Sequence, residues 1–146
     1  MRDNVIELCG DITSNVNVQL IRPVTLNGDV PVTSGSDATY YTQFTSTIDG
    51  GYDLAVNSGA GRAVFAGATP VANVQVTSSP NNFITGNMTT LGSFTWDNTG
   101  GKLTLTSGRT VSAGDDINIL ADVFTNLGGL VAGGTINTPW LKDHWS

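Results

Sequence analysis

A short β-type motif recurs at an interval of 20 residues, and this recurrence constrains the fold more than any other feature. Leu54-x-Val56, Val74-x-Val76 and Phe94-x-Trp96 each place two apolar residues two positions apart, and turn-forming residues follow each pair. Alternation of apolar and polar residues indicates a strand with one buried face, and recurrence at a regular interval indicates a repeat architecture. The stretch from Thr47 to Thr77 therefore predicts a small repeating β-unit.

The same apolar-x-apolar unit recurs along most of the chain. It begins at positions 24, 54, 74, 94, 103 and 117. A β-solenoid with about 20 residues per turn leaves one such strand at an equivalent position on every turn, and each strand stacks on the next. We therefore predict an all-β fold over residues 1–137, a parallel β-helix (β-solenoid) of about six or seven turns. A β-sandwich or jelly roll is the alternative, because short strands with frequent turns suit these folds as well.

The composition agrees with an all-β fold. Only 12% of the residues are charged, which is about half the usual share, so the polar surface must come from Thr, Ser, Asn and Gly. Glu7 is the only glutamate, and Lys102 and Lys142 are the only lysines, so charged helix formers are nearly absent. Thr, Val, Gly and Asn, which favour strands and turns, are abundant.

Charge and hydropathy exclude several partners. The formal net charge is -6, the isoelectric point is about 4.3 and the arginines are scattered, so we expect no binding to nucleic acid or to an anionic membrane surface. No run approaches the ~20 apolar residues of a membrane helix, so we expect no membrane insertion. Residues 1–11 lack the apolar core of a signal peptide. If the protein is exported, we expect its signal to lie outside this chain, or the chain to be a piece of a longer precursor.

Two longer stretches, residues 12–21 and 38–48, are each predicted to form one strand. In the second stretch the four-residue spacing of Tyr40 and Phe44 would also allow a helix, but its many threonines favour a strand. The threonines that flank the aromatic residues are Thr39, Thr42, Thr45 and Thr47. Flat surfaces of threonine and aromatic side chains can bind glycans, so we predict a glycan or partner surface formed by Tyr40, Tyr41 and Phe44. A solvated sheet face without a ligand is the alternative.

The last segment, residues 138–146, differs from the rest of the chain because it contains two tryptophans and no glycine. A solenoid must cover its last open turn, whose unpaired N–H and C=O groups would otherwise recruit other chains. We therefore predict that this segment is an aromatic cap or tail. Trp140, Leu141 and Trp145 would cover the last turn or contact another subunit.

Few residues of this chain can support catalysis. His144 is the only histidine, so a Ser-His-Asp triad or a histidine metal site would have to be built on the last residues. Asp115 and Asp116 form the most suggestive carboxylate pair, but neighbours on a strand point to opposite faces. We interpret this pair as a turn between Gly114 and Ile117. We therefore expect no enzyme activity and no catalytic residue.

Metal and cofactor sites are equally sparse. Cys9 is the only cysteine, so no internal disulfide can form, and we interpret it as a small half-buried residue. Gly59-x-Gly61 does not match a dinucleotide site, because no helix follows to present its N-terminus to a phosphate. We expect no cofactor. Calcium held between turns by Asp49, Asp53 or Asp97 is the alternative, because the local Gly-Gly-Tyr-Asp sequence partly matches a calcium-binding repeat.

Several segments resemble the repeats of filamentous-haemagglutinin-type exoproteins, which are large bacterial surface adhesins with a right-handed parallel β-helix. The segments that carry the resemblance are V-T-L-N-G-D-V (24–30), D-G-G-Y-D-L-A-V-N-S-G-A-G (49–61), F-A-G (65–67), T-P-V-A-N-V-Q-V-T (69–77) and A-G-D-D-I-N-I (113–119). We expect this chain to lack the secretion domain of the family. The resemblance therefore implies a right-handed repeat segment of such an exoprotein, and it supplies no catalytic residues.

Together these observations predict a structural role. We expect a non-enzymatic structural or adhesive repeat segment of a bacterial cell-surface or secreted protein, located outside the cell or on its surface. A self-assembling filament or shell subunit and a carbohydrate-binding module are the alternatives. The expected partners are a host glycan or protein, or copies of the same chain.

Overall fold

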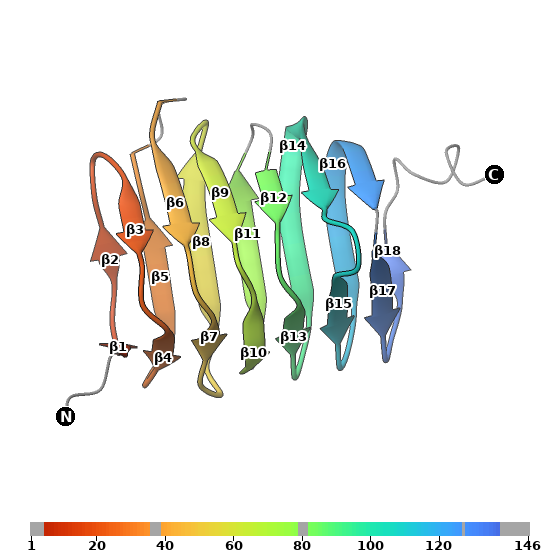
Figure 1. Ribbon diagram of the computed structural model, residues 1–146, viewed down its shortest axis with the longest axis horizontal. Coiled ribbons are helices and arrows are strands. Elements are labelled where there is room, and N and C mark those ends of the chain that lie inside the picture. Colours follow the sequence, from red (N-terminus) through yellow and green to blue (C-terminus); the bar gives the residue numbers. More distant parts are fainter. Residues whose placement is uncertain (1–4, 36–38, 79–81, 127, 138–146) are drawn as a thin grey trace.

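The computed structural model shows a parallel β-solenoid of about six turns, which advances steadily from one end of the molecule to the other (Figure 1). It describes residues 5–35, 39–78, 82–126 and 128–137. Every strand pairing within these ranges is parallel. The predicted all-β solenoid is confirmed, and its right-handed winding stays a prediction.

Each turn visits three sheet faces in the same order. The first face is formed by β1 (Ile6–Leu8), β4 (Val24–Leu26), β7 (Ile48–Asp49), β10 (Ala68–Val71), β13 (Met88–Thr90), β15 (Thr110–Ala113) and β17 (Gly129–Ala132). The second face is formed by β2 (Ile12–Thr13), β5 (Val30–Thr33), β8 (Leu54–Gly59), β11 (Val74–Ser78), the first parts of β14 (Phe94–Leu105) and β16 (Ile117–Asn126), and β18 (Ile136–Asn137). The third face is formed by β3 (Val18–Leu20), β6 (Tyr41–Phe44), β9 (Arg62–Phe65), β12 (Asn82–Ile84) and the last parts of β14 and β16.

Three corners separate these faces, and we number them in chain order. The first corner joins the first face to the second, the second corner joins the second face to the third, and the third corner joins the third face to the first face of the next turn. β14 and β16 run through the second corner, so the second and third faces belong to one 11-stranded sheet.

The strand register explains the repeat in the sequence. On the second face, one column of aligned apolar residues takes one member from each turn: Val30, Leu54, Val74, Phe94, Ile117 and Ile136. The interval between aligned residues varies from 24 (Val30 to Leu54) to 19 (Ile117 to Ile136). Because parallel strands must stay aligned to pair, the corners take up these differences in length.

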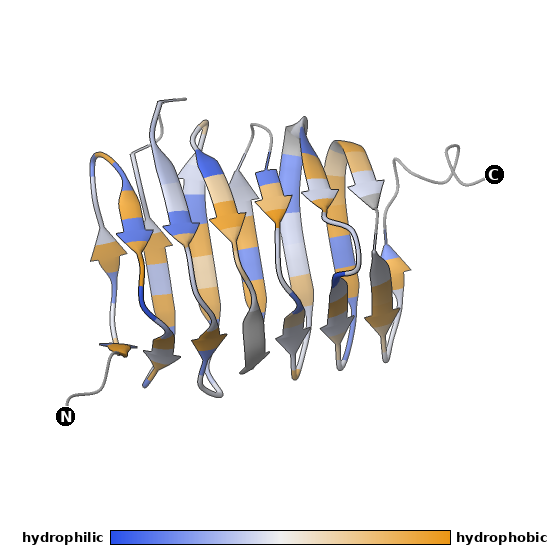
Figure 2. Ribbon diagram, viewed as in Figure 1, coloured by the Kyte–Doolittle hydropathy of each residue, from blue (hydrophilic) through white to orange (hydrophobic). Residues whose placement is uncertain are grey.

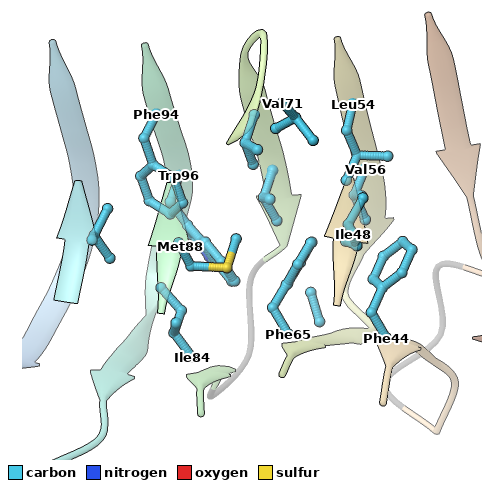
Figure 3. Close-up of a cluster of buried hydrophobic side chains, with 14 of the residues drawn as sticks. Phe44, Ile48, Leu54, Val56, Phe65, Val71, Ile84, Met88, Phe94 and Trp96 are labelled. Carbon is cyan, nitrogen blue, oxygen red and sulfur yellow. The ribbon is translucent and has the colours of Figure 1, made fainter. Parts of the chain in front are cut away.

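The core fills the interior of the solenoid with side chains from alternate strand positions. Figure 2 shows apolar and polar residues alternating along the strands, and Figure 3 shows the inward-pointing members packed together. The Phe44 and Phe65 rings stack with centroids 4.9 Å apart, and Phe65 meets Trp96 edge-on at 5.4 Å. Because these aromatic residues come from different turns, their packing adds to the backbone ladder that holds the turns together.

Polar side chains form a buried ladder inside the second corner. Ser58 Oγ donates a hydrogen bond to Thr42 Oγ1 at 3.0 Å, and Asn82 Nδ2 donates to Asn98 Oδ1 at 2.7 Å. Ser78 Oγ donates to a backbone carbonyl of the preceding turn at 2.6 Å. All five side chains are buried, so the prediction that Thr42 lies on an open threonine face is wrong. The Thr42 hydroxyl points into the interior, where its oxygen accepts the hydrogen bond of the buried Ser58 hydroxyl.

A second ladder lies on the outside of the first corner. The residues directly before β5, β8, β11, β14, β16 and β18 are Asp29, Asp53, Asn73, Ser93, Asp116 and Thr135. Asp29 Oδ1 accepts the backbone N–H of Asp53 at 3.0 Å, and Asn73 Oδ1 accepts that of Ser93 at 2.6 Å. Asp53 Oδ1 accepts a side-chain N–H of Asn73 at 2.9 Å. These bonds between neighbouring turns tie successive turns together at this corner.

Two predicted strands are broken by corners. Residues 12–21 form β2 and β3 on different faces, and residues 38–48 contain β6 and the start of β7. The prediction of one strand in each stretch is therefore wrong. The apolar alternation continues through each bend because inward positions on both sides of a corner face the same core, so periodicity alone does not mark the corner.

Replacing Asn82 with alanine should destabilise the protein by about 2 kcal/mol, because buried polar groups would lose their partner. Asn82 Oδ1 accepts the backbone N–H of Ala63 at 2.8 Å, and that donor would be left buried without a partner. The urea midpoint of unfolding measures this change. Asn118→Ala is the matched control, because Asn118 lies on the outer surface and its removal should cost no more than about 0.5 kcal/mol. Equal midpoints for the two variants would contradict the prediction.

Candidate functional site

The structure separates the three residues of the predicted glycan surface. Phe44 is only 1% exposed and stacks on Phe65 in the core (Figure 3), so its assignment to a surface is wrong. It occupies an inward position of β6, opposite in parity to Tyr41, which is half-buried on the outside of the third face. Tyr40 precedes β6 and lines a hollow at the second corner.

The hollow beside Tyr40 is lined mainly by residues with polar side chains. It has a volume of about 420 Å³ and is lined by Thr13, Ser14, Asn15, Thr33, Ser34, Gly35, Tyr40 and Asn57. A neighbouring hollow of about 310 Å³ on the second face shares Thr33 and Asn57 with it. Hydroxyl and amide groups therefore lie beside apolar atoms on this surface. Such groups can hold water or a sugar by hydrogen bonds, but they do not form an acid–base pair.

A second polar depression runs along the third corner, and we call it the corner groove. Its volume is about 430 Å³, and its lining residues are Thr47, Ala66, Gly67, Thr85, Gly86, Asn87, Thr89 and Arg109. The sequence analysis missed this site because its residues come from four successive turns. Only the stacking of the turns brings positions 47 and 109 to one surface.

Two of the residues that line the corner groove, Gly67 and Gly86, have no side chain, and close backbone packing accounts for the glycine at position 86. A Cβ atom at Gly86 would lie 1.7 Å from the backbone oxygen of Ala66, so no larger residue fits without a shift of the corner. Gly67 has a φ of 146°, a conformation that favours glycine. Gly67 and Gly86 therefore contribute only backbone to the groove, and the threonines, Asn87 and Arg109 carry its functional groups.

The polar groups around the corner groove are held in place. Asn87 Oδ1 accepts the backbone N–H of Thr110 at 3.0 Å, which orients the amide of Asn87. Thr85 Oγ1 donates to the carbonyl oxygen of Phe65 at 3.2 Å, so the lone pairs of this hydroxyl can accept a further hydrogen bond. Arg109 adds a guanidinium at one end of the groove.

Charged side chains are segregated around the solenoid. The lysine and arginine side chains that the structure describes are Arg22, Arg62, Lys102 and Arg109, and all lie on the third face or at the third corner. The described carboxylates lie on the first face, the second face or the first corner: Glu7, Asp11, Asp29, Asp49, Asp53, Asp97, Asp115 and Asp116. The side with the corner groove is therefore the cationic side of an acidic protein.

The acidic residues considered for catalysis or calcium lie elsewhere. Asp115 and Asp116 occupy the first corner between β15 and β16, as the predicted turn requires, and Asp116 Oδ1 accepts a backbone N–H at 2.8 Å. Asp49 lies in β7, Asp53 at the first corner and Asp97 in β14. Within the described ranges, no three His, Cys, Asp or Glu side chains come together in a group that would hold a metal ion.

The remaining candidates can be placed only in part. Cys9 is an exposed free thiol at the first corner, between β1 and β2, so its interpretation as half-buried is wrong. His144 and the predicted cap residues Trp140, Leu141 and Trp145 lie outside the described residues. The described part of the chain contains no helical segment that would serve as a membrane span.

Comparison with known proteins does not assign a family. No protein-family model, curated protein or solved structure matches this chain. The parallel β-solenoid and its surface chemistry are therefore the basis for a functional proposal.

Replacing Gly86 with alanine should lower the stability by about 1–3 kcal/mol, because the new methyl group would overlap the Ala66 carbonyl and force the corners apart. Thermal unfolding followed by circular dichroism would measure the loss. Gly51→Ala is the matched control: a Cβ at Gly51 meets no atom within 4 Å, so this variant should keep or slightly raise the melting temperature. Equal melting temperatures would show that the corners do not pack as described.

Proposed function

We propose that this chain is a non-enzymatic, rigid repeat segment of a bacterial cell-surface or secreted protein, with a structural or adhesive role. The observation that carries the proposal is the stacking of about six turns around a filled core. The resemblance of segments such as 49–61 to the repeats of filamentous-haemagglutinin-type exoproteins supports the same role and a right-handed winding.

Rigidity follows from the way each turn is bonded. The backbone ladder connects every inner turn to both neighbours on the second and third faces, and on the first face it runs within the groups β1-β4-β7 and β10-β13-β15-β17. The two polar ladders connect the corners. Bending the solenoid would open hydrogen bonds and core contacts on one side together. With about 4.8 Å per turn, the described turns form a rod roughly 30 Å long, which suits a spacer that holds a binding surface away from its anchor.

Surface chemistry supports a place outside the cell. The outer face is built from Thr, Ser, Asn and Gln with few charges, and the polar hollows beside Tyr40 offer hydroxyl and amide groups. A host glycan or protein is the partner that we propose for an adhesive role. The hydroxyl and amide groups would meet the hydroxyls of a glycan by hydrogen bonds.

Self-assembly is the second candidate, and the exposure of core-type residues on the first and last described strands favours it. Ile136 is aligned with the fully buried Ile117, yet it is 42% exposed. On β1, β2 and β3, inward-facing Ile6, Ile12 and Leu20 are only partly buried. A sheet edge with exposed core residues can accept strands of another copy.

Negative-stain imaging and sedimentation velocity across a concentration series would test the proposed role. We expect short rods whose sedimentation coefficient does not change with concentration, because a spacer segment acts as a single body. Long filaments or closed shells that grow with concentration would contradict the spacer role and support the assembly subunit. Glycan cleavage that is lost in Asp115→Asn would contradict the non-enzymatic assignment.

A further inference from the structure

We propose that the corner groove binds a saccharide unit that carries a carboxylate, with Arg109 as the anion-binding residue. This inference goes beyond the spacer role and does not depend on it, because a rigid rod can exist with or without this site. Its basis is the combination of an open polar depression, a guanidinium at one end and polar groups that are already oriented.

The cationic end of the groove selects an anion. Arg109 is exposed, and its guanidinium can form two parallel hydrogen bonds to a carboxylate. The described carboxylates at the first corner lie on the other side of the solenoid, so they do not compete for this arginine. Asp49, two residues after Thr47, is not among the residues that line the groove, and its Oδ1 accepts the backbone N–H of Gly50 at 2.7 Å. Arg109 is the charged side chain of the groove lining.

The walls of the groove match the hydroxyl groups of a sugar. Thr47, Thr85 and Thr89 supply hydroxyls that donate and accept hydrogen bonds, and Asn87 supplies an amide. Because Asn87 Oδ1 is already held by the backbone of Thr110, its NH₂ group is the part of the amide that can donate to a ligand. Groups that are oriented before binding lose less conformational freedom when the ligand arrives.

Size and polarity argue against larger or apolar ligands. A volume of about 430 Å³ lies at the small end of the range for ligand sites. The lining contains no large apolar or aromatic side chain that would bind a hydrophobic anchor of a peptide. Gly67 and Gly86 line the groove without side chains, so a flat ring can approach their backbone. A carboxylated sugar ring has the size, hydroxyls and charge that these groups require.

An NMR titration of the ¹⁵N-labelled chain with a short oligogalacturonate would test the proposal. We expect saturable amide shifts confined to residues 66–67, 85–89 and 109–110, whereas a neutral galactan oligosaccharide of equal length should give none. Arg109→Ala should weaken oligogalacturonate binding about tenfold or more, because a charged hydrogen-bonded pair is lost. Asn87→Asp should also abolish binding: its carboxylate can still accept the N–H of Thr110, but it repels the ligand.

Arg62→Ala provides the matched control. Arg62 lies on the third face and does not line the groove, and each of the three variants has a net charge of -7, one below the -6 of the native chain. Arg62→Ala should change binding less than twofold. Equal weakening by all three variants would show that only bulk charge attracts the ligand, and it would overturn the proposal.

Three further outcomes would also overturn it. Absence of shifts with oligogalacturonate would exclude the site, and equal binding of neutral galactan would exclude the role of Arg109. Tighter binding of a sulfated, carboxylate-free oligosaccharide would exclude the carboxylate as the preferred group. The amide spectrum of each variant shows whether it is folded, so Asn87→Asp can decide the question if Arg109→Ala does not fold. None of these outcomes bears on the length or rigidity of the rod.

Discussion

The backbone ladder between successive turns is the interaction on which the rest of this structure depends. On the second and third faces each inner strand is paired on both sides with strands one turn away, so its N–H and C=O groups are satisfied only if these faces stay in phase. This requirement places equivalent residues in straight columns along the axis. A buried residue such as Phe65 must therefore pack against the residues one turn away, and the aligned Phe44 does so by stacking.

The strand register does not fix the length of the corners, so their length and their side chains can differ from turn to turn. The strands cannot change length without losing register, whereas the corners take up the difference between turns of 19 and 24 residues. At the third corner the backbones of adjacent turns approach so closely that Gly86 has no room for a Cβ atom. The corner groove lies along this corner, and Thr85, Asn87 and Arg109 from successive turns line it.

The sequence predicts the fold better than the site, for a physical reason. Equivalent strands recur at nearly equal intervals, so Leu54, Val74 and Phe94 predict stacked turns without knowledge of any contact. The buried polar residues and the groove depend on which residues lie one turn apart, and this depends on the length of each corner. Thr42 therefore has the sequence signature of a surface threonine, although it is buried against Ser58. The corner groove was missed for the same reason.

The spacing of the positive charges along the solenoid determines how its cationic side can bind an anionic ligand. Arg62 and Lys102 occupy the same column two turns apart, which is about 10 Å at the usual strand spacing. The Debye length in physiological salt is about 8 Å, so solvent-exposed charges at this separation act almost independently. A ligand therefore gains little from the average potential of this side, and it must bind close to one cation. Arg109 is such a cation, and it lies in the corner groove beside the oriented amide of Asn87. Selectivity for an anion can therefore arise in the corner groove and not over the whole third face.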